Sequence, residues 1–473
     1  MSGTSSESAG VLLAVSAGLA LATVNSTIVN VALPAIGRHL HADLVLLQWV
    51  VNSFTLVYCA LLLPAGPVGD RIGRRRLLLG GMSVFAAGSV ACAVAPDITS
   101  LIGGRVLQGI GGSAIVPGGL ALLARQFGEP AARARALGVW AGVASLGLAV
   151  GPVVGGVLIS GFGWRSVFWL LSGLAAASVV MVRRLVPERL HGADPQAAPF
   201  DWPGALLGGI WLAALSFALI EAHEYGWSSP EVLGALGVTA ASLAGFVRAE
   251  QRRPPQRPPL MPLGVWRSRS FIAANLGGLA YFLSLFGILF FFSLYLQQQR
   301  GDSALAAGLL FLPLTVVMAV LGPVAGRLVA RIGVRPVVTV GFAVAGCGCL
   351  ALAALPGGSG HVDLELRLLL TGVGFGLMST PMTTAAMGSL PPAAGGLASS
   401  LYNASRQAGA VMGVALLGAV LTARQASVRR HHPGGAAAFL SGLHSAMLVA
   451  GLMLLGSAML SWRLLRGSGG PIS

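Results

Sequence analysis

The chain has 473 residues, of which 55% are hydrophobic and only 10% are charged, and its mean hydropathy is +0.80. No soluble domain hides that much apolar surface, so the composition predicts repeated membrane spans and excludes a water-soluble fold. The net charge is +15, and every basic residue is arginine. Because most arginines fall between apolar runs, this charge does not indicate a nucleic-acid partner.

Apolar runs near the ~20 residues that a bilayer requires predict an all-helical polytopic protein with fourteen spans. We expect them at about 10–33, 46–65, 77–96, 101–124, 136–160, 165–186, 203–222, 231–249, 271–297, 304–329, 335–356, 365–390, 396–422 and 439–462. Polar stretches at Pro187–Phe200 and Gln251–Arg269 bracket the seventh and eighth spans. The predicted domains are therefore an N-terminal six-helix bundle (1–190), linkers with two inserted spans (191–268), and a C-terminal six-helix bundle (269–473).

The stretch between the second and third spans, Gly66–Leu78, holds two glycines after Gly66, one acid and four arginines. A short loop must turn tightly, and glycine supplies the backbone freedom. Gly326–Gly333 repeats the pattern in the second half, with Ala330 in place of Asp70. The repeat predicts two related halves. The residues that we expect to act in gating here are Gly66, Asp70, Arg71, Gly73 and Arg74.

The distribution of arginine predicts the orientation of the chain. Clustered arginines mark the cytoplasmic side of a span, and placing both termini in the cytoplasm puts most of them there. The cluster Arg429, Arg430, His431 and His432 is an exception on the outer side that this orientation does not explain.

The fourth span carries Arg105 and Gln108 within Leu101–Gly109, and the first span carries Asn25. Counting 1.5 Å per residue places Arg105 and Asn25 about 9 and 12 Å from the same face, so they can hydrogen-bond across the bundle. An arginine inside a span indicates a functional role by default. The alternative is a structural arginine bonded to carbonyls or to Asn25. His444, in the last span, is either a proton-exchanging group or a satisfied core residue.

The fifth span contains Gly147-Leu-Ala-Val-Gly151-Pro152-Val-Val-Gly155-Gly156. One face of such a helix has almost no side chains, so a neighbouring helix can pack closely. Pro152 removes a backbone hydrogen bond and permits a bend. We expect Gly151, Pro152, Gly155 and Gly156 to be gating elements.

These motifs, in this order, resemble the major facilitator superfamily. Thr27–Pro34, Asp201–Gly204, Gly226-Trp227 and Asn403–Gly409 are similar to its fourteen-span drug/proton antiporter family, which includes methylenomycin A resistance proteins and quaternary-ammonium exporters. The resemblance implies a non-enzymatic, alternating-access, proton-coupled exporter of small amphipathic drugs or metabolites in the cell membrane. It implies no cofactor beyond the proton gradient. The candidate substrate and coupling residues are Asn25, Asn30, Asn52, Arg105, Gln108, Tyr281, Phe286, Met378, Asn403 and Arg406.

The sequence departs from the family at Asn25, where the family has an aspartate. Asparagine exchanges no proton near neutral pH, and none of the predicted spans has an acid in its middle. A proton-independent facilitator and a non-transporting membrane sensor therefore remain alternatives. A cavity with arginine and no acid repels cations, which predicts a neutral or weakly acidic amphipathic substrate. The other expected partner is the lipid bilayer, and we expect a monomer. Four cysteines in apolar runs fit neither a disulfide framework nor a metal site.

Overall fold

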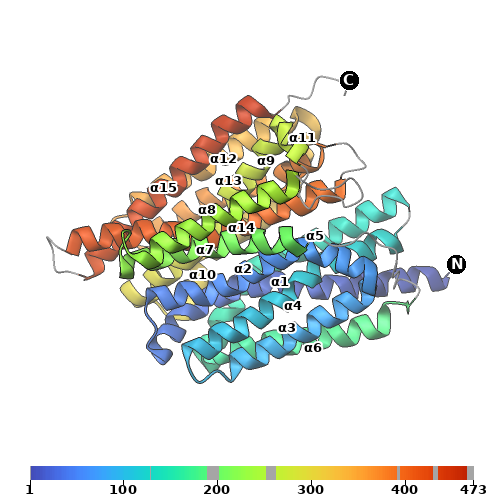
Figure 1. Cartoon of the computed structure of the whole chain (residues 1–473), viewed down its shortest axis with the longest axis horizontal. Helices are drawn as coiled ribbons and strands as arrows, with labels where there is room; N and C mark the ends of the chain where they lie inside the picture. Colours follow the sequence, from blue (N-terminus) through green and yellow to red (C-terminus); the bar gives the residue numbers. More distant parts are fainter. Residues whose placement is uncertain are drawn as a thin grey trace. The chain divides into compact units, whose positions relative to one another are not determined.

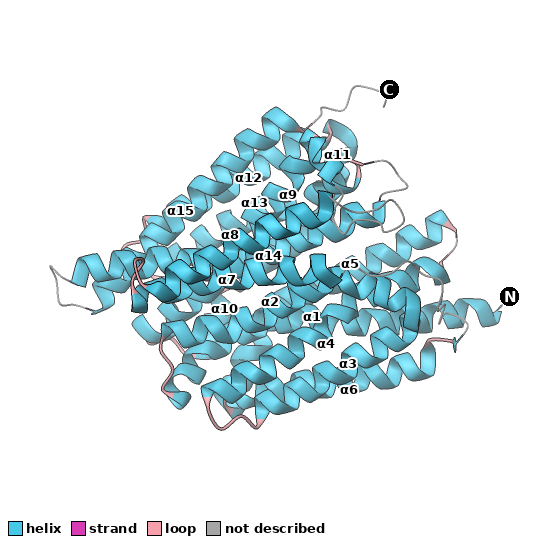
Figure 2. Cartoon of the chain, viewed as in Figure 1, coloured by secondary structure: helices cyan, strands magenta, loops and turns pink. Residues whose placement is uncertain are grey.

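The structure is a computed structural model that describes residues 2–127, 129–188, 202–251, 263–390, 395–429 and 435–465. Every regular element within these ranges is helical, and none of them is a strand (Figure 2). The predicted all-helical fold is confirmed for this part of the chain. The described residues form two compact units, one up to Gly209 and one from Ile210 onward. The predicted bundle boundaries stay a prediction.

The first unit is built from six long helices and the beginning of a seventh (Figure 1). They are α1 (Ser2–Leu40), α2 (Leu44–Ile72), α3 (Arg74–Ala93), α4 (Ile98–Gln126), α5 (Pro130–Phe162) and α6 (Arg165–Leu185). Helix α3 packs on both α4 and α6, α4 packs on α2, and α1 packs on α5 and α6. This arrangement puts α1, α2 and α4 around the same interior.

The second unit holds most of α7 and all later helices. They are α7 (Trp202–Tyr225), α8 (Pro230–Gln251), the short η2 (Leu263–Arg267), α9 (Arg269–Leu294), the π-helical turn η3 (Tyr295–Gln299), α10 (Ala304–Leu310), α11 (Leu312–Ile332), α12 (Val334–Ala353), α13 (His361–Met387), α14 (Gly395–Arg429) and α15 (Gly435–Leu464). Helix α9 packs on α14 and α15, and α12 packs on α13 and α15. Helices α7 and α8 meet through a small cluster of Ala218, Ala222 and Val232.

Among the described residues, twelve helices are long and apolar enough to cross a membrane. The expected count of fourteen spans is therefore not confirmed. Helix α7 contributes only the shorter apolar helix Leu206–Ala222, and α13 is not among the twelve. The first two turns of α13 carry Asp363, Glu365 and Arg367, which lower its hydropathy.

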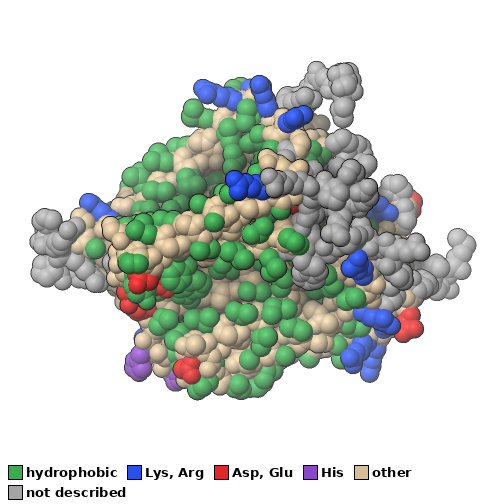
Figure 3. All heavy atoms as spheres, viewed as in Figure 1, with side chains coloured by type: hydrophobic (Ala, Val, Ile, Leu, Met, Phe, Trp, Pro, Cys, Tyr) green, Lys and Arg blue, Asp and Glu red, His purple; other side chains and the backbone are tan. Residues whose placement is uncertain are grey.

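Large apolar side chains lie exposed along the helices, as a protein surrounded by lipid requires. Phe162, Leu146 and Trp169 are 78%, 62% and 52% exposed, respectively. In the space-filling view, hydrophobic side chains cover the flanks of the helices, and charged side chains gather near their ends (Figure 3). The structure is thus that of a multi-pass membrane protein.

The two copies of the repeated sequence pattern each end a helix at a glycine. Helix α2 ends at Ile72 and α11 at Ile332. Gly73 and Gly333 follow them with φ of 96° and 84°, in the region that favours glycine. Their N–H groups donate to Gly69 O at 3.0 Å and to Val329 O at 2.8 Å. The tight turn between α2 and α3 was therefore predicted correctly.

The extent of that turn was predicted wrongly. Gly66 lies inside α2, because the helix continues through Pro64 and Pro67 to Ile72. Only Gly73 separates α2 from α3. The apolar part of α2 ends at Leu62. Hydropathy marked the end of the apolar run, whereas the helix itself ends at the glycine.

Side chains cap the starts of α2 and α4, which lie at the other end of these helices from Gly73. Asp43 Oδ1 accepts from Leu46 N at 2.9 Å at the start of α2, and Asp97 Oδ1 accepts from Ser100 N at 2.8 Å at the start of α4. The hydrogen bonds from Ser100 hold the pKa of the Asp97 carboxyl below its ordinary value. Such caps satisfy N–H groups that the helix itself leaves without partners.

Candidate functional site

Arg105 lies at the centre of the first unit, on α4, with a relative exposure of 2%. Its Nε donates to Val50 O of α2 at 3.0 Å. Its Nη1 donates to Asn25 Oδ1 of α1 at 3.0 Å and to Gln108 Oε1 at 2.8 Å. One guanidinium therefore joins three helices, and the predicted hydrogen bond between Arg105 and Asn25 is confirmed.

A relay of hydrogen bonds fixes the side chain of Gln108. Its Nε2 donates to Ser89 Oγ of α3 at 2.7 Å, and Ser89 Oγ donates to Phe85 O at 2.8 Å. The amide oxygen of Gln108 is thereby turned toward Arg105. Asn25, Ser89, Arg105 and Gln108, together with Phe54, are called the Arg105 cluster below.

Phe54 of α2 covers the face of the guanidinium. The Arg105 Cζ atom lies 4.4 Å from the centre of the Phe54 ring, a cation–π distance. Phe54 in turn stacks on Tyr58, with ring centres 5.7 Å apart, and meets Phe85 edge-on at 6.5 Å. The aromatic ring completes a rigid surrounding for the charge.

The Arg105 cluster holds a positive charge without an acid. Within the described part of the chain, each hydrogen-bond acceptor of Arg105 is neutral: a backbone carbonyl and two amide oxygens. Burying a charge is costly unless it is paired, and neutral acceptors offset only part of that cost. A cation placed beside Arg105 would find no counter-charge among these acceptors.

Two asparagines of the first unit have amide atoms without a partner among the described residues. They are Nδ2 of Asn25, and both Nδ2 and Oδ1 of Asn52. Asn25 is 1% exposed and Asn52 is fully buried. An unsatisfied buried amide costs about 1–3 kcal/mol, so these atoms are suited to a hydrogen-bonding ligand. Asn30, on the same helix as Asn25, donates through Nδ2 to Ser26 O at 3.1 Å.

In the second unit, Arg406 of α14 lies among aromatic rings. Its Cζ is 4.1 Å from the centre of the Phe282 ring of α9 and 5.6 Å from that of Tyr402. Its Nη1 donates to Asn403 Oδ1 at 3.5 Å, and its buried Nε has no acceptor in the described residues. Arg406, Asn403, Phe282 and Tyr402 form the Arg406 cluster.

Other predicted residues of α9 and α13 lie around this cluster or beside it. Phe286 packs against Phe282 at 5.5 Å between ring centres, and Tyr281 meets Phe282 edge-on at 5.1 Å. Met378 is fully buried on α13, and the helix packs so closely there that a Cβ on Gly341 of α12 would lie 2.9 Å from its Cβ. Met378 therefore lies in the α12–α13 contact.

Sequence reasoning missed Ser89, Phe54 and Tyr402. Phe54 meets Arg105 from α2 and Ser89 bonds Gln108 from α3, and the sequence alone does not bring these helices together. Tyr402 stands four residues before Arg406 on the same helix, so i, i+4 spacing was a signal that could have found it.

The predicted gating residues at the end of α2 form a local ion pair. Arg74 Nη2 donates to Asp70 Oδ1, four residues earlier in the chain, across Gly73. Arg71 is exposed. The role of these residues in gating stays a prediction.

The glycine face of α5 packs on α1, as expected from its small residues. A Cβ on Gly155 would lie 2.8 Å from Ile28 Cγ1, and one on Gly151 would overlap Thr27 Oγ1. Gly156 and Pro152 are buried on the same helix. The close α1–α5 contact therefore needs glycine at Gly151 and Gly155.

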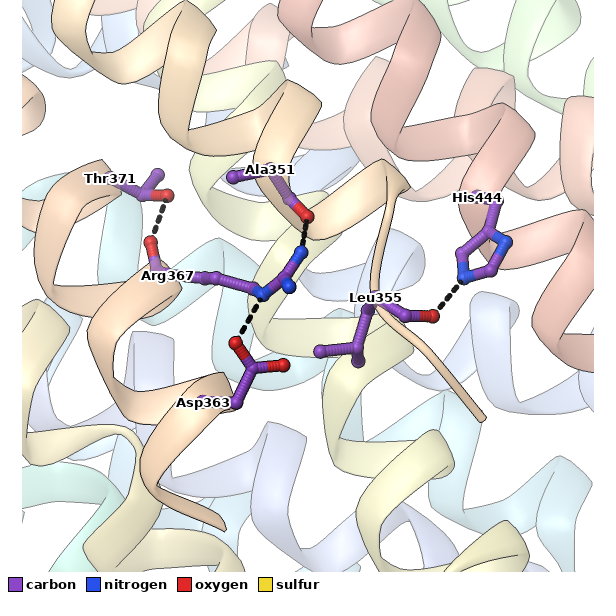
Figure 4. Close-up of polar contacts among 6 residues, drawn as sticks. All are labelled: Ala351, Leu355, Asp363, Arg367, Thr371 and His444. Atoms are coloured by element: carbon purple, nitrogen blue, oxygen red, sulfur yellow. Dashed lines mark hydrogen bonds and ion pairs between the residues drawn. The ribbon is translucent and has the colours of Figure 1, made fainter. Parts of the chain in front are cut away.

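Two further polar residues anchor the end of α12 (Figure 4). His444 of α15 is half-buried and bonds Leu355 O through Nε2 at 2.8 Å, so its ring has a hydrogen-bond partner, and the choice between the two predicted roles stays open. Arg367 of α13 donates to Asp363 Oδ1 at 2.9 Å and to Ala351 O, one of the last carbonyls of α12. Arg367 thus binds a carbonyl in the last turn of α12, and His444 binds one just beyond the end of that helix.

A small recess in the second unit has a volume of about 150 Å³ and is lined by Ala222, Trp227, Ala419, Thr422 and Ala423. Drug-sized ligands occupy pockets of roughly 300–1,000 Å³, so this recess is too small to hold one. The predictions at Asp201, Arg430, His431 and His432 lie outside the described residues.

The helical fold and the exposed apolar flanks define a polytopic membrane protein, and comparison with known proteins agrees. The sequence matches the Major Facilitator Superfamily over residues 15–414. The chain belongs to this superfamily.

The chain is similar to the methylenomycin A resistance protein of Streptomyces coelicolor, with 34% identity over 96% of this chain and 92% of that protein. It is 36% identical to the multidrug resistance protein Stp of Mycobacterium tuberculosis, over 87% of this chain and 75% of that protein. A bacterial homologue of the lysosomal transporter Spinster shares the fold, with a TM-score of 0.69, 17% identity and 96% coverage of each chain.

Proposed function

We propose that the protein exports small amphipathic drugs or metabolites from the cytoplasm by alternating access. Membership of the superfamily supports transport, and relatives named for methylenomycin A resistance and multidrug resistance support export. The observation that carries the proposal is the Arg105 cluster, where a buried charge and the Nδ2 group of Asn25 offer hydrogen bonds inside the membrane.

The proposed arrangement has fourteen spans in the cell membrane. Helices α7 and α13 would cross in addition to the twelve, since their 24 and 27 residues are long enough for a bilayer. Both termini would lie in the cytoplasm, because that orientation places most arginines inside. The two inserted helices, α7 and α8, would then join two six-helix bundles.

The proposed substrate is neutral or weakly acidic. A lipophilic cation needs a counter-charge when it leaves water, and the acceptors around Arg105 are neutral. A carboxylate or a neutral polar group can accept from Arg105 or Arg406, and arginine forks suit carboxylates. Asn25 and Asn52 can donate to the same molecule through their amide groups.

Asn25 bears on whether transport is coupled to protons. Relatives of the antiporter type would exchange protons at an acid, and asparagine does not titrate. If the protein is an antiporter, the coupling group lies elsewhere in the chain. A proton-independent facilitator is the second candidate, and the Asn25–Arg105 bond is the observation that favours it.

The test is solute efflux from proteoliposomes that contain the purified protein. Efflux that rises with an imposed pH gradient supports an antiporter, and equal efflux with and without the gradient supports a facilitator. No solute movement in either condition, with the protein folded and inserted, would favour a membrane sensor and contradict the proposal.

A further inference from the structure

One end of the first unit carries a group of arginines, where α3 begins and α6 ends. In the space-filling view, arginine side chains gather at the end of this unit where the chain starts (Figure 3). The members from these two helices are Arg74, Arg75, Arg76, Arg183 and Arg184.

Arg75 binds the two helix ends together. Its Nε donates to Val186 O at 2.8 Å and its Nη2 donates to Arg183 O at 2.9 Å. These are carbonyls at the end of α6, where a helix carries partial negative charge that attracts a cation. The contact holds the start of α3, which carries Arg76, against the end of α6, which carries Arg183 and Arg184.

Two acids near this corner lie beside Arg74 and Arg75. Asp70 pairs with Arg74, and Glu188 lies 3.9 Å from Arg75. In the described residues, Arg76, Arg183 and Arg184 have no ion pair, and all three are exposed. Three positive charges therefore remain on the surface.

Two of these arginines continue the lipid-facing stripes of their helices. On α3, Arg76 is followed at intervals of four by Gly80 and Val84, both exposed. On α6, Arg184 follows Val180, which is 47% exposed and lies four residues earlier. Residues four apart lie on one face of a helix. On each helix, exposed residues without a polar side chain therefore lie on the same face as the arginine at the helix end, as expected at the depth of lipid headgroups.

We propose that this corner, formed by Arg76, Arg183 and Arg184, binds the phosphate of an anionic phospholipid whose acyl chains lie along the exposed stripes of α3 and α6. Guanidinium groups bind phosphate through paired hydrogen bonds, so arginine is well suited to this role. A lipid is favoured over free phosphate because the apolar stripes lie directly beside the charges. The site does not depend on the transported substrate.

The experiment measures binding of phosphatidylglycerol to the purified full-length chain by native mass spectrometry, with phosphatidylcholine as the neutral comparison. We expect the wild type to retain phosphatidylglycerol selectively. The double variant Arg76→Gln/Arg184→Gln should bind it about tenfold or more weakly, since each arginine near a charged surface contributes ~1 kcal/mol. Arg76→Lys/Arg184→Lys keeps the charges and should retain most of the binding, which separates the site from misfolding.

The matched control is Arg248→Gln/Arg331→Gln, which removes the same charge from two exposed arginines of the second unit. We expect it to bind like the wild type. Equal weakening by the control would show that only net charge matters and would overturn the proposal. Unchanged binding by Arg76→Gln/Arg184→Gln would overturn it too. Full displacement of the lipid by millimolar inorganic phosphate would assign the site to free phosphate instead.

Discussion

Nη1 of Arg105 donates to Oδ1 of Asn25 over 3.0 Å, joining α4 to α1 through a bond between a charged donor and a neutral acceptor. An aspartate at the same position would make this contact a salt bridge. With asparagine, the positive charge of Arg105 stays uncompensated by any acid among its hydrogen-bonded partners in the described residues. The balance of charge at this bond is the basis for the predicted substrate class.

The first prediction concerns a variant with an added negative charge beside Arg105. Asn25→Asp places a carboxylate beside Arg105, so it should improve export of a lipophilic cation such as ethidium. We expect an increase of about tenfold, corresponding to a counter-charge that contributes ~1.4 kcal/mol. The measurement is the initial rate of ethidium efflux from cells that carry the variant.

Asn30→Asp is the matched control for Asn25→Asp. Asn30 is on the same helix and is also buried, but its Nδ2 donates to Ser26 O. We expect no gain in ethidium efflux from this variant. An equal gain would mean that any added acid on α1 suffices, and it would refute the assigned role of the Asn25–Arg105 bond.

The second prediction concerns the relay behind Arg105. Ser89→Ala removes the acceptor of Gln108 Nε2, so the amide can turn and release Arg105. We expect transport to fall about fivefold, as for a lost hydrogen bond of ~1 kcal/mol. The rate of substrate efflux at matched protein levels measures it.

Ser178→Ala tests whether that loss is specific. Ser178 is buried on α6 and bonds Leu174 O of its own helix at 2.8 Å. This variant should transport like the wild type. If both serine variants lose transport equally, the relay has no special role.

Only part of the Arg105 cluster could be predicted from the sequence. Residue counting along each span placed Asn25 and Arg105 at similar depth, because helical rise is constant, and the bond between them exists. The positions of Ser89 and Phe54 depend on how α3 and α2 are rotated against α4. That rotation depends on close contacts such as Gly81 of α3, where a Cβ would lie 2.6 Å from Ala114 Cβ of α4, and single-sequence patterns do not fix it.

The fold, too, could be predicted only in part. The turn at Gly73 was predictable, because a one-residue link between helices demands a backbone conformation that glycine adopts. The end of α2 was not, because its helix outlasts its apolar run by several residues. We predicted more spans than the hydropathy of the helices supports. One of the extra spans, α13, begins with charged residues, which continue a helix as readily as apolar residues do but lower its hydropathy.

The third prediction concerns the close contact between α5 and α1. Gly151→Ala should separate the two helices, because the added methyl overlaps Thr27 Oγ1. Overpacking of this kind costs ~1–3 kcal/mol. We expect a lower thermal unfolding temperature in detergent and reduced transport.

Two companion variants make this prediction sharper. Gly142→Ala lies on the same helix with no atom within 4 Å of the new methyl, so it should behave like the wild type. Thr27→Ala should partly restore Gly151→Ala by removing the overlapping oxygen. Loss of stability in Gly142→Ala, or no restoration by Thr27→Ala, would count against the packing explanation.

The fourth prediction concerns Asp70. Asp70→Asn breaks the ion pair with Arg74, but a partly exposed pair contributes only about 0–1 kcal/mol, so the protein should stay folded. If Asp70 helps to close the cytoplasmic side, the variant should favour inward-facing states and turn over slowly. Labelling of single cysteines placed at the cytoplasmic ends of α2 and α14 measures this shift. Unchanged labelling with full transport would exclude the role of Asp70 in gating.

The most direct test of the account compares two substrates of opposite charge in the same proteoliposomes. The wild-type protein should transport pyrenebutyrate, a weakly acidic amphipathic probe, and should transport ethidium poorly. Arg105→Gln should abolish the preference between them, because it removes the charge that repels the cation. Rapid ethidium transport by the wild type, driven by a pH gradient and unaffected by Arg105→Gln, would contradict the account.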